Sequence, residues 1–110
     1  MDERRARQVS LNEAVFRELN ERLEQLTEPA DAEELLDLVC ECGDASCTAR
    51  IRVARQDYED TRSVPTHFVV APGHVEPGIE RVLQKRADYD LIEKAPGIPA
   101  DVAKDTDPRA

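Results

Sequence analysis

The sequence predicts an α+β domain, in which an N-terminal amphipathic helix packs on a small, mainly antiparallel sheet with a zinc-knuckle-like site. Three features predict this class: apolar residues at helical spacing early in the chain, later segments of alternating polarity, and three closely spaced cysteines. The 110 residues are 40% hydrophobic but only 4% aromatic, so the core must be aliphatic. A chain of this length forms one domain with a modest core, which often needs a metal or a partner chain.

Apolar residues at helical spacing predict an amphipathic helix over residues 10–27. Ser10 and Glu13 have the spacing of a capping box, so the helix is expected to begin there. The same spacing contains short heptads, which leaves a homodimer through residues 10–27 open, although packing on the chain's own domain is favoured. The stripe expected to face the core consists of Leu11, Val15, Phe16, Leu19, Leu23 and Leu26.

Segments of alternating polarity follow this helix and are typical of strands. A Gly-Asp turn separates the first two of them. Near the end of this region, helical spacing from Ile79 competes with a hairpin around residues 86–88, and the hairpin is favoured. The expected strands are 36–42, 49–53, 67–70, 80–85 and 89–94, with a short helix over 55–63 in which Tyr58 points inward.

Both ends of the chain are expected to lie outside the folded domain. Residues 1–9 are mostly charged, which predicts a flexible arm. Prolines, small residues and charges in residues 95–110 predict a disordered tail. The domain itself is therefore expected to span residues 10–94.

The segment with the clearest chemistry is a C-x-C-x4-C pattern formed by Cys40, Cys42 and Cys47. On a strand, residues i and i+2 point to the same side, and the turn after Gly43 can return the third cysteine to the same point. Three converging thiolates need a cation, and tetrahedral zinc with sulfur ligands fits best. His74 follows a rigid Ala-Pro-Gly turn and is the expected fourth ligand.

The other histidine, His67, starts an alternating strand and is expected to be an ordinary surface residue. A site of three cysteines and one histidine is closed, and a closed zinc site is structural rather than catalytic. We therefore expect no catalytic residues. The leading interpretation is a small zinc-binding regulatory or adaptor protein that acts through protein contacts.

Two other functions remain open from these residues. The thiolates could serve as a redox or zinc-release sensor, because peroxide oxidises exposed thiolates. Alternatively, His74 and Glu76 form an H-x-E triplet, which zinc deaminases use for a ligand and a general acid/base. In a small zinc hydrolase or deaminase, Glu76 would be the base, although the cysteines here lie upstream in another spacing.

The formal net charge of −9 is concentrated early in the chain, where residues 10–47 carry eleven acidic residues against two arginines. An acidic surface repels phosphate backbones, so direct binding of nucleic acid is not expected. The pattern indicates either a solvated face or a docking face for a partner with a basic surface. That face would comprise residues 31–37 and the acidic side of the helix, with Glu13, Glu21 and Glu24.

Localisation is predicted from the apolar pattern. No apolar run approaches the roughly 20 residues of a membrane span. The sequence MDERRARQ lacks the apolar region of a secretory signal, so a cytoplasmic protein is expected. Three clustered thiols in a reducing compartment are more typical of metal binding or redox chemistry than of disulfides.

Across residues 12–94 the sequence resembles a group of small, uncharacterised proteins of high-GC Gram-positive bacteria. The resemblance implies no particular activity. It implies that the three cysteines and His74 belong to one site, and it gives His67 no counterpart. A glycine would be expected within residues 86–88, where this chain has none. The matching features are residues 16–22, 40–44, Cys47, 58–59, Arg62, Pro65, Phe68, Val70, 72–74, Tyr89, 93–94 and 106–109.

Overall fold

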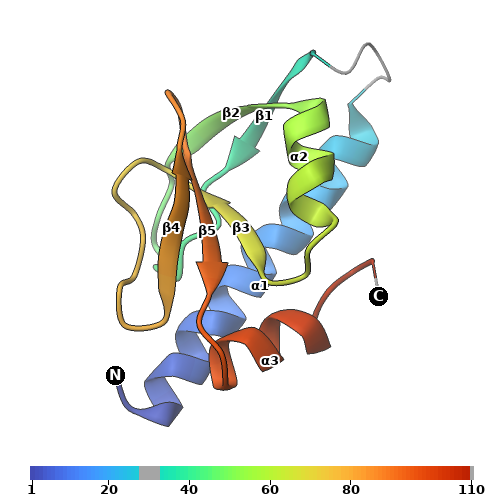
Figure 1. Ribbon diagram of the computed structural model, residues 1–110. Helices are drawn as coiled ribbons and strands as arrows, with labels where there is room; N and C mark the ends of the chain where they lie inside the picture. Colours follow the sequence, from blue (N-terminus) through green and yellow to red (C-terminus); the bar gives the residue numbers. More distant parts are fainter. Residues whose placement is uncertain (28–32, 110) are drawn as a thin grey trace.

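The structure, a computed structural model, describes residues 1–27 and 33–109 and has the expected α+β class. A long helix runs along one side of the molecule, and the strands and two shorter helices lie against it (Figure 1). None of the helices in these two ranges is long and apolar enough to cross a membrane. The elements in order are α1 (Glu3–Leu26), β1 (Leu35–Val39), β2 (Arg50–Ala54), α2 (Arg55–Arg62), β3 (His67–Val70), β4 (Glu80–Lys85), β5 (Asp90–Lys94) and α3 (Ile98–Asp105).

The strands form two small antiparallel sheets. β1 pairs with β2, and the second sheet has the order β3-β5-β4. The predicted hairpin is confirmed, since the Arg86 N–H donates to the Tyr89 carbonyl at 2.8 Å between β4 and β5. The two sheets meet just beyond β1, where the Glu41 N–H donates to the Val69 carbonyl at 2.9 Å. The core around this junction includes Leu36, Leu38, Ile51, Val53, Tyr58, Phe68, Val69, Val70 and Ile92.

Helix α1 begins earlier than its sequence predicted. Asp2 is the N-cap, and its side chain accepts a hydrogen bond from the Arg5 N–H at 2.8 Å. The expected flexible arm of residues 1–9 is therefore wrong, because residues 3–9 form the first turns of α1. Ala6 and Val9 are buried there against Ile79, which gives these turns a small core of their own. The expected capping box is wrong as well, because its residues lie inside the helix.

The end of the chain is also ordered. Residues 95–110 were expected to form a disordered tail, but α3 lies within them and packs against α1. Gly97 has a φ of 95° and precedes the helix, and Pro99 lies in the first turn, where its missing N–H costs no helical hydrogen bond. The expectation was wrong because prolines that start a helix were interpreted as breakers. Ala100, Val102 and Ala103 are buried.

The buried face of α1 is the reverse of the predicted one. Val15 is 66% exposed and Leu26 is 82% exposed, and Leu11 and Leu19 are exposed as well. Of the predicted stripe, Leu23 packs against the main core. The face that is buried instead is polar. It contains Ser10, Glu13, Arg17, Asn20 and Glu21.

Ion pairs and hydrogen bonds make this polar face compatible with burial. Lys94 of β5 contacts Glu13 and also bonds Glu80 Oε1 at 2.7 Å. Glu21 Oε1 accepts hydrogen bonds from Arg62 at 2.9 Å and from Arg109 at 2.7 Å. Glu13 and Glu21 are buried and have partners within the chain, so they cannot bind another protein. The expected acidic docking face is therefore wrong at both residues.

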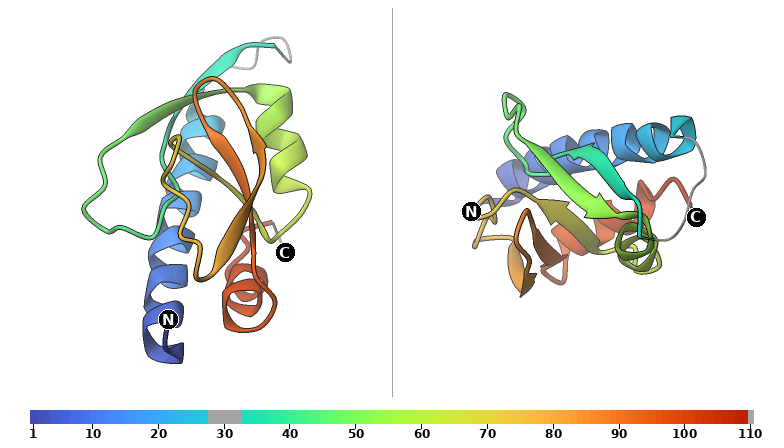
Figure 2. Two further views of the ribbon diagram at one scale, coloured as in Figure 1. Left: turned by 60° about the vertical axis from the view of Figure 1, so that its left-hand side comes forward. Right: turned by 90° about the horizontal axis from the view of Figure 1, so that it is seen from above.

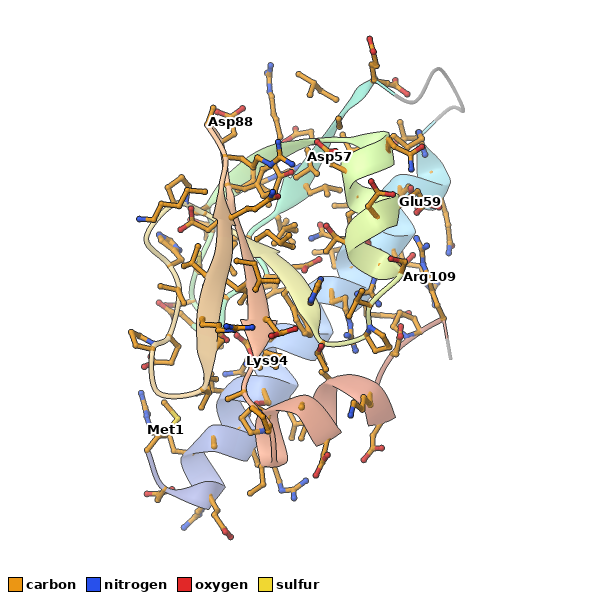
Figure 3. All side chains as sticks on the ribbon, viewed as in Figure 1. Met1, Asp57, Glu59, Asp88, Lys94 and Arg109 are labelled. Carbon is orange, nitrogen blue, oxygen red and sulfur yellow. The ribbon has the colours of Figure 1, made fainter. Side chains whose placement is uncertain are left out.

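The third predicted docking residue, Glu24, is also engaged within the chain. Its carboxylate lies 3.6 Å from Arg55 and 3.2 Å from Arg109. Figure 3 shows Arg109 beside Glu59, to which it bonds at 2.6 Å. Residues 31 and 32 of the other proposed docking segment lie outside the described residues. Several of the acidic residues early in the chain therefore form ion pairs within the chain.

The Glu13–Lys94–Glu80 cluster predicts a pH dependence of folding. Burial, with a further contribution from Glu80, raises the pKa of Glu13 to about 9. The folded state thus binds a proton that the unfolded state has already lost above the ordinary glutamate pKa of 4.5. The contribution of Glu13 to the free energy of unfolding is therefore complete below pH 4.5. It is lost as the pH rises towards 9, by at most about 1.4 kcal/mol per pH unit for one proton.

Glu13→Gln mimics the protonated carboxyl group and should flatten this slope of the free energy of unfolding. The measurement is urea denaturation across the same pH window, with Glu18→Gln, a variant of a partly exposed glutamate on the same helix, as control. An unchanged slope in Glu13→Gln would contradict the assignment.

Candidate metal centre

Three sulfurs and one imidazole nitrogen meet at the junction of the two sheets. The ligand atoms of Cys40, Cys42, Cys47 and His74 all lie within 4.8 Å of one another. The predicted residues are therefore brought together. Cys40 and Cys42 follow β1, Cys47 precedes β2, and His74 follows β3.

Local hydrogen bonds fold the loop between β1 and β2 back on itself. The Cys40 N–H donates to the Ala49 carbonyl at 3.0 Å, which extends the β1–β2 pairing by one step. The Cys47 N–H donates to the Asp44 carbonyl at 3.0 Å. The Asp44 carboxylate also accepts hydrogen bonds from the N–H and the hydroxyl of Ser46, at 2.9 and 2.7 Å. This tight turn returns Cys47 to the other two sulfurs, as the Gly-Asp sequence predicted.

Helix α1 fixes the position of the same loop (Figure 2). Asn12 Nδ2 donates to the Gly43 carbonyl at 2.9 Å. A Cβ at Gly43 would lie 2.1 Å from Val9 Cγ1, so only glycine permits this close approach of helix and loop. Asn12 therefore holds the loop that carries the cysteines.

His74 reaches the cysteines from a tight turn. Its N–H donates to the Ala71 carbonyl at 2.9 Å, and Gly73 has a φ of 81°, the arrangement of a type II turn after Pro72. The Ala71 N–H donates to Cys40 Sγ at 3.1 Å, so the turn is joined directly to a ligand. His74 Nδ1 then lies 3.5 Å from Cys40 Sγ and 3.7 Å from Cys47 Sγ.

The structure also separates the two histidines. His67 Nε2 lies 3.2 Å from Glu93 Oε2 on the neighbouring strand, away from the cysteine cluster. His67 is therefore a cross-strand partner, as expected for an ordinary strand residue. The choice of His74 over His67 as the clustered histidine is confirmed.

Sequence reasoning missed the part played by Glu41, the residue between the first two cysteines. Its carboxylate accepts hydrogen bonds from the Val69 N–H at 3.0 Å and from Asn20 Nδ2 at 2.8 Å. Burial raises the pKa of Glu41, and these two donors oppose the increase. Asn20 also exchanges hydrogen bonds with the backbone of Val39, so α1, β1 and β3 are linked beside the sulfurs. Strand alternation could have revealed this, since residue 41 must point away from the cysteine face.

The surroundings of the sulfurs favour a bound cation. Burial raises the pKa of the Cys40 and Cys42 thiols, which are only 1% and 4% exposed. Both would stay protonated without a positive charge nearby. Hydrogen bonds from backbone N–H groups to both sulfurs oppose the increase, in the manner of outer-shell donors to metal-bound thiolates. Three sulfurs with one imidazole nitrogen match a closed tetrahedral zinc site.

A pocket of about 600 Å³ adjoins this cluster. His74 and Glu76 line it together with Arg5, Gln8 and Asn12 of α1. Glu76 is not one of the four clustered residues. If all four residues bound one zinc ion, they would complete a tetrahedral coordination sphere and leave no position for the activated water that a zinc hydrolase requires.

In comparisons with protein-family models, curated proteins and solved structures, nothing matches this chain.

The turn that presents His74 gives a direct test of the site. Gly73→Ala introduces a side chain that meets no atom within 4 Å but strains a φ of 81°. Relaxation of this strain should move His74, so we expect weaker zinc binding and a loss of about 1–2 kcal/mol of stability. Competition with a chromogenic chelator measures the affinity.

Gly97→Ala is the matched control, because Gly97 has a φ of 95° and equally open surroundings before α3. It should lose similar stability and keep its affinity for zinc. Equal losses of affinity in the two variants would show that Gly73 does not act through His74.

Proposed function

We propose that this chain is a small zinc-binding protein in which the ion is a structural staple and the function is carried by protein contacts. The observation that supports the staple is the convergence of Cys40, Cys42, Cys47 and His74 within 4.8 Å. We further propose that the protein acts in the cytoplasm and belongs with the bacterial proteins that it resembles.

The position of the cluster explains why a metal would stabilise the fold. The ligands come from the end of β1, the loop before β2 and the turn after β3, so one ion would join both sheets. Glu41 and Val69 form the backbone contact between the sheets at the same place. Because such a site rarely forms in the unfolded chain, the binding free energy of the metal becomes folding free energy.

Elemental analysis and native mass spectrometry test the staple on the purified wild type, His74→Ala and His67→Ala. We expect one zinc ion per chain in the wild type and in His67→Ala, and much weaker retention in His74→Ala. His67→Ala is the matched control, since it removes the other histidine and loses only the pairing with Glu93. A metal-free wild type would contradict the proposal, and so would equal zinc content in both variants.

For the protein contacts we propose the exposed apolar face of α1, formed by Leu11, Val15, Leu19 and Leu26. Large exposed apolar patches are typical of protein interaction sites. Leu11 and Leu19 lie one turn to either side of Val15. A two-fold axis across Val15 would therefore place Leu11 of one copy against Leu19 of another in an antiparallel pair. The occupant that we propose is a second copy of this chain.

Val15→Asp places a charge at the centre of the proposed contact. Because Val15 is 66% exposed, the substitution should disturb the core of the chain little. We expect a dimer for the wild type and a monomer for Val15→Asp in sedimentation equilibrium. Thermal denaturation should show similar stability for the two proteins. Glu18→Gln, at the edge of the same face, serves as control and should remain dimeric. A monomeric wild type up to millimolar concentration would contradict self-association through α1.

A further inference from the structure

The three cysteines of the metal centre differ in how well they are protected. Cys40 Sγ accepts hydrogen bonds from the N–H groups of Ala71, at 3.1 Å, and of Cys42. Cys42 Sγ accepts one from the Asp44 N–H. Cys47 Sγ lies 3.7 Å from His74 Nδ1. Cys47 is also the only one of the three that is not fully buried.

These differences determine which sulfur can react. Attack on an oxidant or electrophile needs thiolate character and access, and donated hydrogen bonds withdraw charge from a sulfur. Cys42 lines the pocket beside the cluster, but only 4% of its surface is exposed. The neighbour of Cys47 Sγ is the imidazole of His74, a solvent-exposed residue that covers this side of the cluster poorly.

We propose that Cys47 is the site at which peroxide oxidises the metal centre, with Cys42 as the resolving thiol. This inference rests on the proposed metal-bound state. The geometry supports Cys42 because its Sγ lies within 4.8 Å of Cys47 Sγ and the residue lines the pocket beside the cluster. Oxidation would then release the zinc ion, and this release would be the response of the protein to peroxide.

The reaction balances with hydrogen peroxide as the only co-reactant. A lone pair of the Cys47 thiolate attacks one peroxide oxygen, the O–O bond breaks, and hydroxide leaves, so that sulfur is oxidised to sulfenic acid. The Cys42 thiolate then attacks this sulfur, the S–O bond breaks, and a second hydroxide leaves as the disulfide forms. Two thiolates and one peroxide thus give one disulfide and two hydroxides. Because two of four ligands are lost, the zinc ion dissociates.

Oxidation would also affect the contact between helix α1 and the loop that carries Cys47. Cys47 closes the loop that begins at Gly43, and this loop is held by Asn12 and by the close approach of Val9. Loss of the ion removes the link between this loop and the turn after β3. We therefore expect hydrogen exchange to increase in residues 43–49 on oxidation.

The test uses zinc-loaded wild-type protein whose zinc content has first been measured. The protein is treated with less than one equivalent of hydrogen peroxide, a dimedone probe traps sulfenic acid, and peptide mass spectrometry locates it. We expect early modification of Cys47 to exceed that of Cys40 by roughly tenfold. A Cys42–Cys47 disulfide and one released zinc ion per chain should follow, the latter measured with a chromogenic chelator.

Cys47→His and Cys40→His are matched variants, because each keeps four metal ligands. Peroxide-driven zinc release should slow roughly tenfold in Cys47→His and stay near the wild-type rate in Cys40→His. If neither variant retains zinc, the order of modification in the wild type decides the question. Initial oxidation of Cys40 or Cys42, or a Cys40–Cys42 disulfide, overturns this inference while the zinc staple stands. A wild type without zinc overturns both proposals.

Discussion

The rest of the structure depends on a row of buried polar side chains along α1. Glu13 contacts Lys94 of β5, Arg17 donates to the carbonyls of Pro65 and Ala103, and Glu21 binds Arg62 and Arg109. Each polar side chain therefore fixes the helix to a different part of the chain. Removal of one partner from a buried ion pair leaves an uncompensated charge, which typically costs about 3–5 kcal/mol. These contacts specify one position and one rotation of the helix.

The metal centre is a continuation of this row. Asn20 links the backbone of Val39 to the Glu41 carboxylate, which in turn accepts the Val69 N–H. The cysteines on either side of Glu41 point in the opposite direction, towards His74. Helix docking, the junction of the sheets and presentation of the ligands thus share one connected set of hydrogen bonds. A metal ion on the cysteine side would stabilise the same junction that Glu41 holds on the helix side.

The elements and the site could be predicted from the sequence because both are encoded locally. Alternation gave the strands, and a short cysteine spacing with a Pro-Gly turn gave the clustered ligands. The orientation of α1 could not be predicted, because a periodic apolar stripe normally faces the core and only distant partners such as Lys94 and Arg109 reverse this preference. The same partners explain why Glu13 and Glu21 were misjudged as a surface. Residues 98–105 were misjudged because their helix is stabilised by packing on α1 rather than by its own sequence.

We propose that four protein ligands hold one zinc ion at the junction of the two sheets. X-ray absorption spectroscopy at the zinc edge on the purified protein measures this coordination shell. We expect three sulfurs at about 2.3 Å, one nitrogen at about 2.0–2.1 Å and no water in the shell. A shell of oxygen ligands, or one with an open position occupied by water, would contradict a closed structural site.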